Sequence, residues 1–230
     1  METIRKNWET FQERLARAAA HAGRDPREIT VVAVTKTRPP AQIEAAIRSG
    51  IHIVGENRVQ EAEAKKDCVG VEAQWHLVGH LQTNKAQKAV ALFDLVQSVD
   101  SIRTATALDA RAGQAGRILD ILVQVNTSGE VHQSGVDPHE LQDLIEQITL
   151  LSNLQIQGLM TIGALSADES VVRPCFSRLR ELREQLVAAR IDRVEMKYLS
   201  MGMSGDFELA IAEGANMLRL GTSIFGPRPT

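Results

Sequence analysis

Two basic residues lie close to the ends of apolar runs, and both side chains can take part in chemistry. Lys36 comes shortly after the run ITVVAV, and Arg219 lies within NMLRLGTS. Desolvation of a lysine favours the neutral amine, which attacks carbonyl carbons. A guanidinium on an apolar strand needs an acceptor from the protein or from a ligand. By residue type alone, Lys36 can equally be a solvated strand end and Arg219 a member of an ion pair.

Small and hydroxyl-bearing residues gather in two segments near the C-terminus, 200–204 (SMGMS) and 221–223 (GTS). Small residues let backbone amides approach an anion, hydroxyls add donors, and a helix expected from about Asp206 adds its dipole. The same composition is typical of simple turns. The two segments predict a phosphate site if they follow neighbouring strands of one sheet.

Other reactive residues form no convincing pattern. His76 and His80 are four residues apart on a strand and its loop, where that spacing does not align two side chains, so we expect no metal site. No Ser/His/Asp constellation and no P-loop is present. Cys68 and Cys175 are far apart and form no C-x-x-C pair, which favours a reducing, cytoplasmic setting.

Short β-branched runs alternate with helical patterns along the chain. We expect strands at 30–35, 51–54, 74–78, 95–98, 119–125, 155–160, 196–200 and 217–220. We expect helices at 3–22, 40–49, 57–66, 83–91, 101–113, 138–150, 170–189 and 206–213, and a closing turn after Gly221. Eight such units predict an α/β fold, a (β/α)8 TIM barrel with an extra N-terminal helix, with a doubly wound open sheet as the alternative. We expect residues 1–230 to form a single domain, since no linker interrupts the pattern.

A barrel places its active site at the carboxyl ends of its strands, and many barrels bind phosphate after the seventh and eighth strands. Lys36 follows the first expected strand, and the two small-residue segments follow the seventh and eighth. Because the first strand neighbours the eighth in a closed barrel, the lysine and the phosphate site are expected side by side.

Composition excludes several classes of partner. The 230 residues are 43% hydrophobic and 24% charged, with a net charge of -3. That balance gives no electrostatic reason to expect nucleic acid or an anionic membrane as partner. No apolar stretch reaches membrane-spanning length, and the N-terminus lacks the apolar core of a signal peptide.

Six segments carry a resemblance to a known family. They are VAVTKTRPP, GIHIVGENRVQEAEAK, WHLVGHLQTNK, QVNTSGEVHQSGV, GLMTIGA and LSMGMSGDFELAIAEGANMLRLGTSIFGPR. In this order, from about Ile29 to Arg228, they resemble the pyridoxal phosphate homeostasis proteins, which are single-domain relatives of the alanine racemase barrel. The resemblance implies a fold-type III barrel that binds pyridoxal 5'-phosphate (PLP).

The resemblance also implies roles for individual residues. Lys36 would hold PLP as a Schiff base, Arg219 would face the pyridine nitrogen, and Asn57 would line the cofactor. The loops after the last two strands would hold the phosphate. The implied cofactor-binding residues are Lys36, Asn57, Ser200, Met201, Gly202, Arg219, Gly221 and Thr222, with no catalytic residue.

The function implied is regulatory: the protein would take part in vitamin B6 homeostasis, buffering PLP or delivering it to apo-enzymes, without being an enzyme. The alternative is a PLP-dependent amino-acid racemase on the same barrel. A racemase needs a proton donor and an acceptor on opposite faces of its substrate, and only Lys36 is an evident candidate. The one tyrosine, Tyr198, is expected to be structural, and the chain ends at Thr230, before the second domain of the racemases. A third reading is an aldolase-like barrel for a sugar phosphate, which gives Arg219 no role. We expect a monomer.

Overall fold

Eight parallel strands close into a barrel in the computed structural model, which describes residues 2–227. The strands are β1 (Thr30–Val34), β2 (Ile53–Glu56), β3 (Gln74–Leu77), β4 (Leu95–Val99), β5 (Leu119–Gln124), β6 (Leu154–Met160), β7 (Val194–Ser200) and β8 (Met217–Leu220). Each strand pairs with the next, and β8 pairs with β1. This closure confirms the (β/α)8 barrel and excludes the doubly wound sheet.

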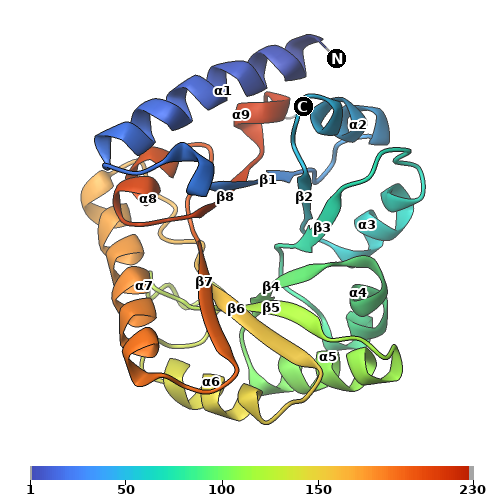
Figure 1. The fold of residues 1–230 in the computed structure, drawn as a ribbon, viewed down its shortest axis with the longest axis vertical. Coiled ribbons are helices and arrows are strands. Elements are labelled where there is room, and N and C mark those ends of the chain that lie inside the picture. The colour runs from blue at the N-terminus through green and yellow to red at the C-terminus, as the bar shows by residue number, and fades with distance from the viewer. Residues whose placement is uncertain (1, 228–230) are drawn as a thin grey trace.

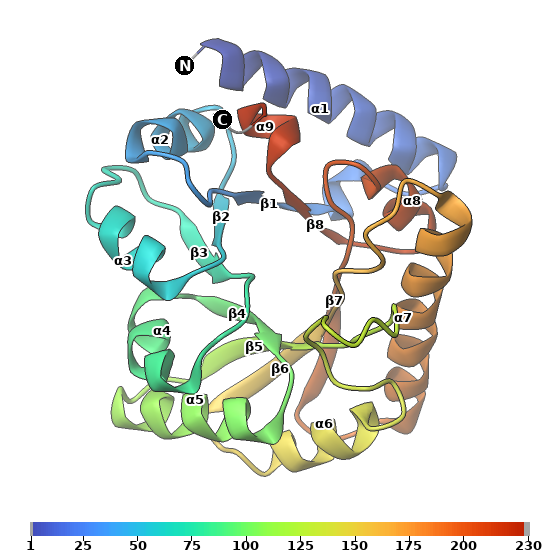
Figure 2. The same cartoon turned by 180° about the vertical axis from the view of Figure 1, so that it is seen from behind.

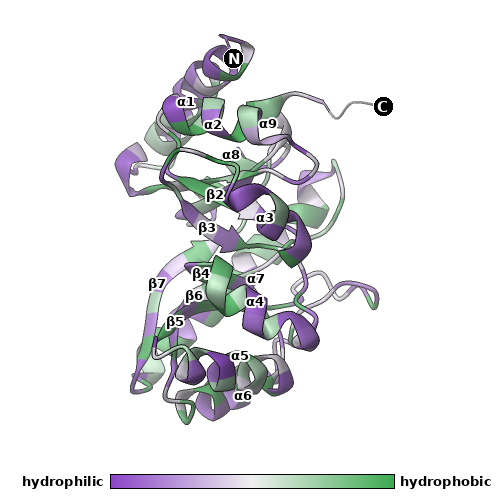
Figure 3. Cartoon of the chain, turned by 90° about the vertical axis from the view of Figure 1, so that its right-hand side faces the viewer, coloured by the Kyte–Doolittle hydropathy of each residue, from purple (hydrophilic) through white to green (hydrophobic). Residues whose placement is uncertain are grey.

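Helices surround the barrel (Figures 1 and 2). They are α1 (Glu2–His21), α2 (Pro40–Arg48), α3 (Val59–Lys66), α4 (Ala86–Leu92), α5 (Ile102–Gln114), α6 (Leu141–Thr149), α7 (Glu169–Ala189), α8 (Phe207–Ala212) and α9 (Thr222–Phe225), with 3-10 turns η1 (Pro26–Glu28) and η2 (Thr83–Lys85). The extra N-terminal helix, α1, packs on α8 and α9, and its Phe11 ring lies 4.9 Å from that of Phe207. Hydrophilic and hydrophobic residues alternate along α1 because one of its faces is buried (Figure 3).

Several expected boundaries were wrong, among them that of β7, which begins two residues earlier, and that of α6, which begins three residues later than expected. The region 83–91 divides into η2 and α4, and the segment after Gly221 contains the helix α9 where a closing turn was expected. In α9, the amides of Ile224 and Phe225 both donate to the Gly221 carbonyl, at 3.1 and 2.9 Å. The second strand lies two residues later than expected, because it includes Gly55 and the buried Glu56.

Alternate residues of each strand face the barrel interior or the helices. Val32, Leu95, Leu122 and Met217 belong to a small cluster inside the barrel, and Val34 packs against it. Ala33, the residue between Val32 and Val34, belongs to the larger cluster under the helices. Continued for one more period, this alternation directs Thr35 outward and Lys36 toward the mouth of the barrel.

Candidate functional site

A cavity of about 380 Å³ opens at the carboxyl ends of the strands and brings together five of the eight predicted site residues. They are Lys36, Asn57, Arg219, Gly221 and Thr222. The apolar side chains of Val34, Val78, Ile162 and Leu165 form much of the remaining wall. The volume suits a small ligand, and an apolar wall with a few polar groups is typical of binding sites for small molecules.

Lys36 reaches this cavity from the turn that follows β1, and its side chain is half-buried. The strand ends at Val34, and α2 begins at Pro40. Proline is well suited to the first position of a helix, because its missing N–H would have no partner there and its φ is already helical. Pro39 and Pro40 therefore end the extended segment and start α2 close to Lys36.

Arg219 is buried, and its guanidinium is held from inside the barrel. Nη1 donates to the hydroxyl of Ser200 and Nη2 to the carbonyl of Thr161, both at 2.7 Å. Burial lowers the pKa of Arg219 to about 10, although the charge of Asp206 opposes the shift, so the group remains a cation at neutral pH. Both of these acceptors are neutral. An electron-rich or anionic ligand in the cavity would therefore be attracted to Arg219.

A chain of buried hydrogen bonds continues from Arg219 across the barrel interior. Ser200 donates to Oε1 of Gln97 at 2.7 Å, and Nε2 of Gln97 lies 3.0 Å from Nδ1 of His76. Burial lowers the pKa of His76 to about 4, so its ring is neutral and Nδ1 accepts this bond. The order of donors, Arg219 to Ser200 to Gln97 to His76, fixes the orientation of the guanidinium.

Ser200, Met201 and Gly202, the other three predicted site residues, lie behind the cavity wall. The Met201 side chain is fully buried, and its amide donates to the Met217 carbonyl at 3.1 Å. Gly202 has φ +91, and a Cβ there would lie 2.5 Å from the Cβ of Ala210, so the position requires glycine. These residues shape the end of β7, but they do not line the cavity.

Ser204 is a cavity residue that the predicted set omits. Its hydroxyl accepts hydrogen bonds from the amides of Gly221 and Ser223, at 3.3 and 3.1 Å, so the loops after β7 and β8 converge on one point. Met203 and Gly205 beside it also line the cavity. Amides and hydroxyls that converge in this way suit an anion. The hydroxyl of Ser204 within SMGMS was the available sequence signal.

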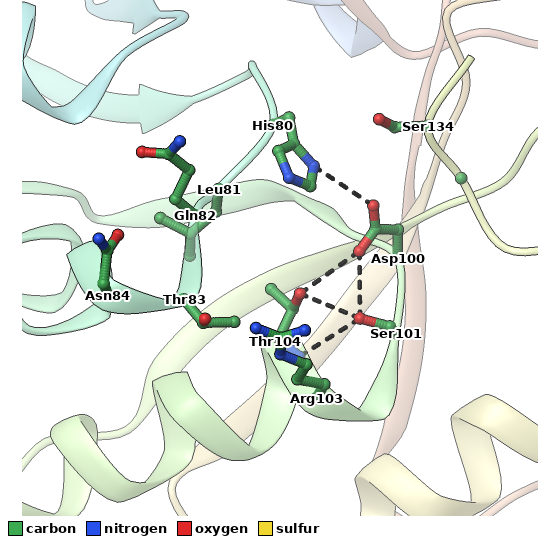
Figure 4. Close-up of a pocket in the computed structure, with 11 residues that line it drawn as sticks. His80, Leu81, Gln82, Thr83, Asn84, Asp100, Ser101, Arg103, Thr104 and Ser134 are labelled. Atoms are coloured by element: carbon green, nitrogen blue, oxygen red, sulfur yellow. Dashed lines mark hydrogen bonds and ion pairs between the residues drawn. The ribbon is translucent and has the colours of Figure 1, made fainter. Parts of the chain in front are cut away.

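A second pocket, of about 680 Å³, lies at the N-terminal end of α5 (Figure 4). Its carboxylate, Asp100, already accepts from Ser101 at 3.3 Å and from Thr104 at 3.4 Å, and it lies 3.5 Å from Nδ1 of His80. The start of α5 is capped by the hydroxyl of Ser101, which accepts from the Thr104 amide at 3.3 Å. Within residues 2–227, no group of His, Cys, Asp and Glu side chains is arranged to hold a metal ion. Nor does any helix in this range have the length and apolar character needed to cross a membrane.

Comparisons with known proteins agree with this architecture. The family model for the N-terminal domain of alanine racemase matches residues 2–229. Pyridoxal phosphate homeostasis proteins of Aquifex aeolicus and Pseudomonas aeruginosa are 40% and 38% identical, over 94% and 99% of this chain and 94% and 97% of theirs.

Solved structures extend the comparison to the fold. PipY of Synechococcus elongatus, solved with PLP bound, is 38% identical and has a TM-score of 0.81, over 92% of this chain and 100% of PipY. Alanine racemase of Clostridium difficile, at 16% identity and a TM-score of 0.78, shares the fold over 100% of this chain and 58% of its own. The chain belongs to the pyridoxal phosphate homeostasis protein family, whose barrel is that of the alanine racemase N-terminal domain.

Proposed function

We propose that this protein binds PLP in the cavity at the barrel mouth, holds it covalently on Lys36, and buffers or delivers it within vitamin B6 metabolism. One observation carries the proposal: an amine, a buried guanidinium and a set of anion-binding donors line the same small cavity. Lys36 comes from the turn after β1, Arg219 from β8, and Gly221 and Ser204 from the loops after β8 and β7. The names of the relatives and the PLP-bound PipY structure support the choice of ligand.

The residues of the cavity fit the three parts of the cofactor. The hydroxyls of Ser204 and Thr222 offer donors for a phosphate, and the amides of Gly221 and Ser223, which already donate to Ser204, point toward the same place. Val34, Val78 and Ile162 offer apolar surface for an aromatic ring. When bound, PLP supplies an aldehyde whose carbon bonds to an attacking amine while its oxygen leaves as water.

This proposal assigns an indirect role to Ser200, Met201 and Gly202, which position cavity residues without lining the cavity themselves. Ser200 acts by holding Arg219. Met201 and Gly202 act by directing the loop that carries Ser204. Asn57 lines the cavity next to Gly79, where a Cβ would come within 3.0 Å of the backbone of Asn57.

The same geometry favours a carrier over a racemase. Among the described residues, those that line the cavity provide one amine, that of Lys36, and no tyrosine. Tyr198 packs against the cluster inside the barrel instead. A guanidinium keeps its own protons, so Arg219 would donate a hydrogen bond to a ring nitrogen without protonating it. An unprotonated ring is a weaker electron sink, which suits storage of the cofactor better than carbanion chemistry.

Spectroscopy of the purified protein tests the proposal. We expect a visible absorption band after incubation with PLP, its loss in Lys36→Ala, and its retention in Lys85→Ala, whose lysine lies outside the cavity. Borohydride reduction followed by peptide mapping should place the pyridoxyl label on Lys36. A label on another lysine would refute the assignment of Lys36. Racemisation of alanine above the rate of free PLP, abolished by Lys36→Ala, would refute the carrier function.

The proposal includes the setting in which the protein acts. We place it in the cytoplasm, as a monomer and a single domain over residues 1–230, of which 1 and 228–230 lie outside the described part. The two cysteines, Cys68 and Cys175, are free thiols, as a reducing compartment favours. Sedimentation of the full chain tests the monomer. Transfer of PLP from the loaded protein to an apo-enzyme, faster than from an equal amount of free PLP, tests delivery.

A further inference from the structure

The turn that carries Lys36 adopts a backbone conformation that its sequence does not favour. Thr37, directly after Lys36, has φ +63, in the left-handed region that β-branched residues rarely occupy. Thr35, directly before it, is fully buried on the helix side of β1. A strained residue persists only where its surroundings hold it, so the contacts of these two threonines decide where Lys36 points.

Three charged residues of β2 and α3 hold the two threonines: Glu56 and Lys65 bind Thr35, and Glu61 binds Thr37. The hydroxyl of Thr35 donates to Oε1 of Glu56 at 2.7 Å, and its carbonyl accepts from Nζ of Lys65 at 3.0 Å. The amide of Thr37 donates to Oε2 of Glu61, also at 3.0 Å. Lys36 thus lies between two residues that are fixed by side chains of β2 and α3.

Lys65 joins the two carboxylates into one unit. Its Nζ lies 2.8 Å from Oε1 of Glu56 and 3.0 Å from Oε2 of Glu61. The Glu56 side chain is 0% exposed and that of Lys65 12%. Oε2 of Glu56 is buried with no hydrogen-bond partner among the described residues. Buried charges of this kind contribute little net stability, and an apolar replacement is often as stable. Stability alone therefore does not explain why three charges stand at this position.

We propose that Glu56, Glu61 and Lys65 form a clamp that positions Lys36, keeping its amine directed into the cavity. These are positioning residues, since they act on Lys36 through Thr35 and Thr37. This inference depends on the proposed function in one respect, the identity of the aldehyde that reacts with Lys36. A displacement of about 1 Å slows reactions between held groups by up to about a hundredfold, so a loosened turn has a measurable effect.

The test compares Lys65→Met with Lys88→Met. Lys88 also pairs with a glutamate of α3, Glu63, but that pair is exposed and neither side chain bonds to Thr35 or Thr37. We expect Lys65→Met to form the absorption band about tenfold more slowly than the unmodified protein, and Lys88→Met to stay within about twofold. Without cofactor, amide hydrogen exchange of Thr37 should be at least about tenfold faster in Lys65→Met and unchanged in Lys88→Met.

Glu61→Gln and Glu61→Ala provide a second, independent pair if Lys65→Met does not fold. Glutamine keeps an oxygen that can accept from the Thr37 amide, whereas alanine keeps none, so Glu61→Gln should retain most of the Thr37 protection that Glu61→Ala loses. Protection of Thr37 and band formation at the unmodified rate in Glu61→Ala, and in Lys65→Met if it folds, would overturn the clamp. Failure of the unmodified protein to bind PLP would refute the proposed function instead, while Thr37 exchange would still decide whether the clamp exists.

Discussion

Ser200→Ala tests whether the buried hydrogen-bond chain holds Arg219. The Ser200 hydroxyl is fully buried, accepts from Arg219 Nη1 and donates to Gln97 Oε1, each at 2.7 Å. Alanine leaves a guanidinium N–H and an amide oxygen without this partner. A hydrogen bond to a charged group contributes about 1.5–3 kcal/mol and a neutral one about 0.5–1.5 kcal/mol. The expected loss in the free energy of unfolding is therefore about 3 kcal/mol.

Urea unfolding of the cofactor-free protein measures this loss, and thermal unfolding should show a midpoint lower by about 6–12 °C for a chain of this size. Ser170→Ala is the matched control: its hydroxyl also bonds at 2.7 Å, to Asp168, but in an exposed position. The control should change stability by less than about 0.5 kcal/mol. Equal effects of the two substitutions would refute the view that Ser200 acts by holding Arg219.

Two further predictions concern the same site. The pKa of His76 is about 4 in the folded state and 6.5 ordinarily, so the unfolded state binds more protons between these values and stability falls as the pH is lowered through them. Urea unfolding should show that the free energy of unfolding falls by about 2 kcal/mol from pH 7.5 to pH 5, and by less in His76→Asn. An equal fall in both proteins would contradict the lowered pKa of His76. Gly79→Ala places a Cβ 2.8 Å from Cα of Asn57, and we expect it to destabilise the protein by about 1–3 kcal/mol and weaken PLP binding in a titration. Gly70→Ala, whose Cβ would meet a flexible side chain oxygen at 3.4 Å, should do neither.

The eight strands of the barrel could be read from the sequence because strand and helix patterns are local. Runs such as that of β1 are short, continuous and β-branched, and each is followed by a helical period. Among the boundaries that differ, that of β2 is instructive, because the strand extends to Glu56. A charged residue is typical of the start of a loop, and the contacts of Glu56 with Lys65 of α3 and with the hydroxyl of Thr35 permit its burial.

The sequence did not predict which loop residues face the cavity. Position in the chain placed Lys36 and Arg219 at strand ends, and both line the cavity. The loop SMGMS offered two serines with the same chemistry, and the resemblance implied Ser200. In the structure Ser200 accepts a hydrogen bond from Arg219, and the chain turns at Gly202, so that Ser204 reaches the cavity.

The sequence by itself determined the alternation of strands and helices, and with it the edge of the sheet on which the reactive residues lie. The tertiary structure decided the direction of each side chain there. Direction depends on partners far along the chain, such as Gln97 for Ser200 and Glu61 for the amide of Thr37. The bond between Gln97 of β4 and Ser200 of β7 crosses the barrel interior and needs the closed barrel, whereas the Glu61 contact needs only β2 paired with β1 and α3 packed beside them.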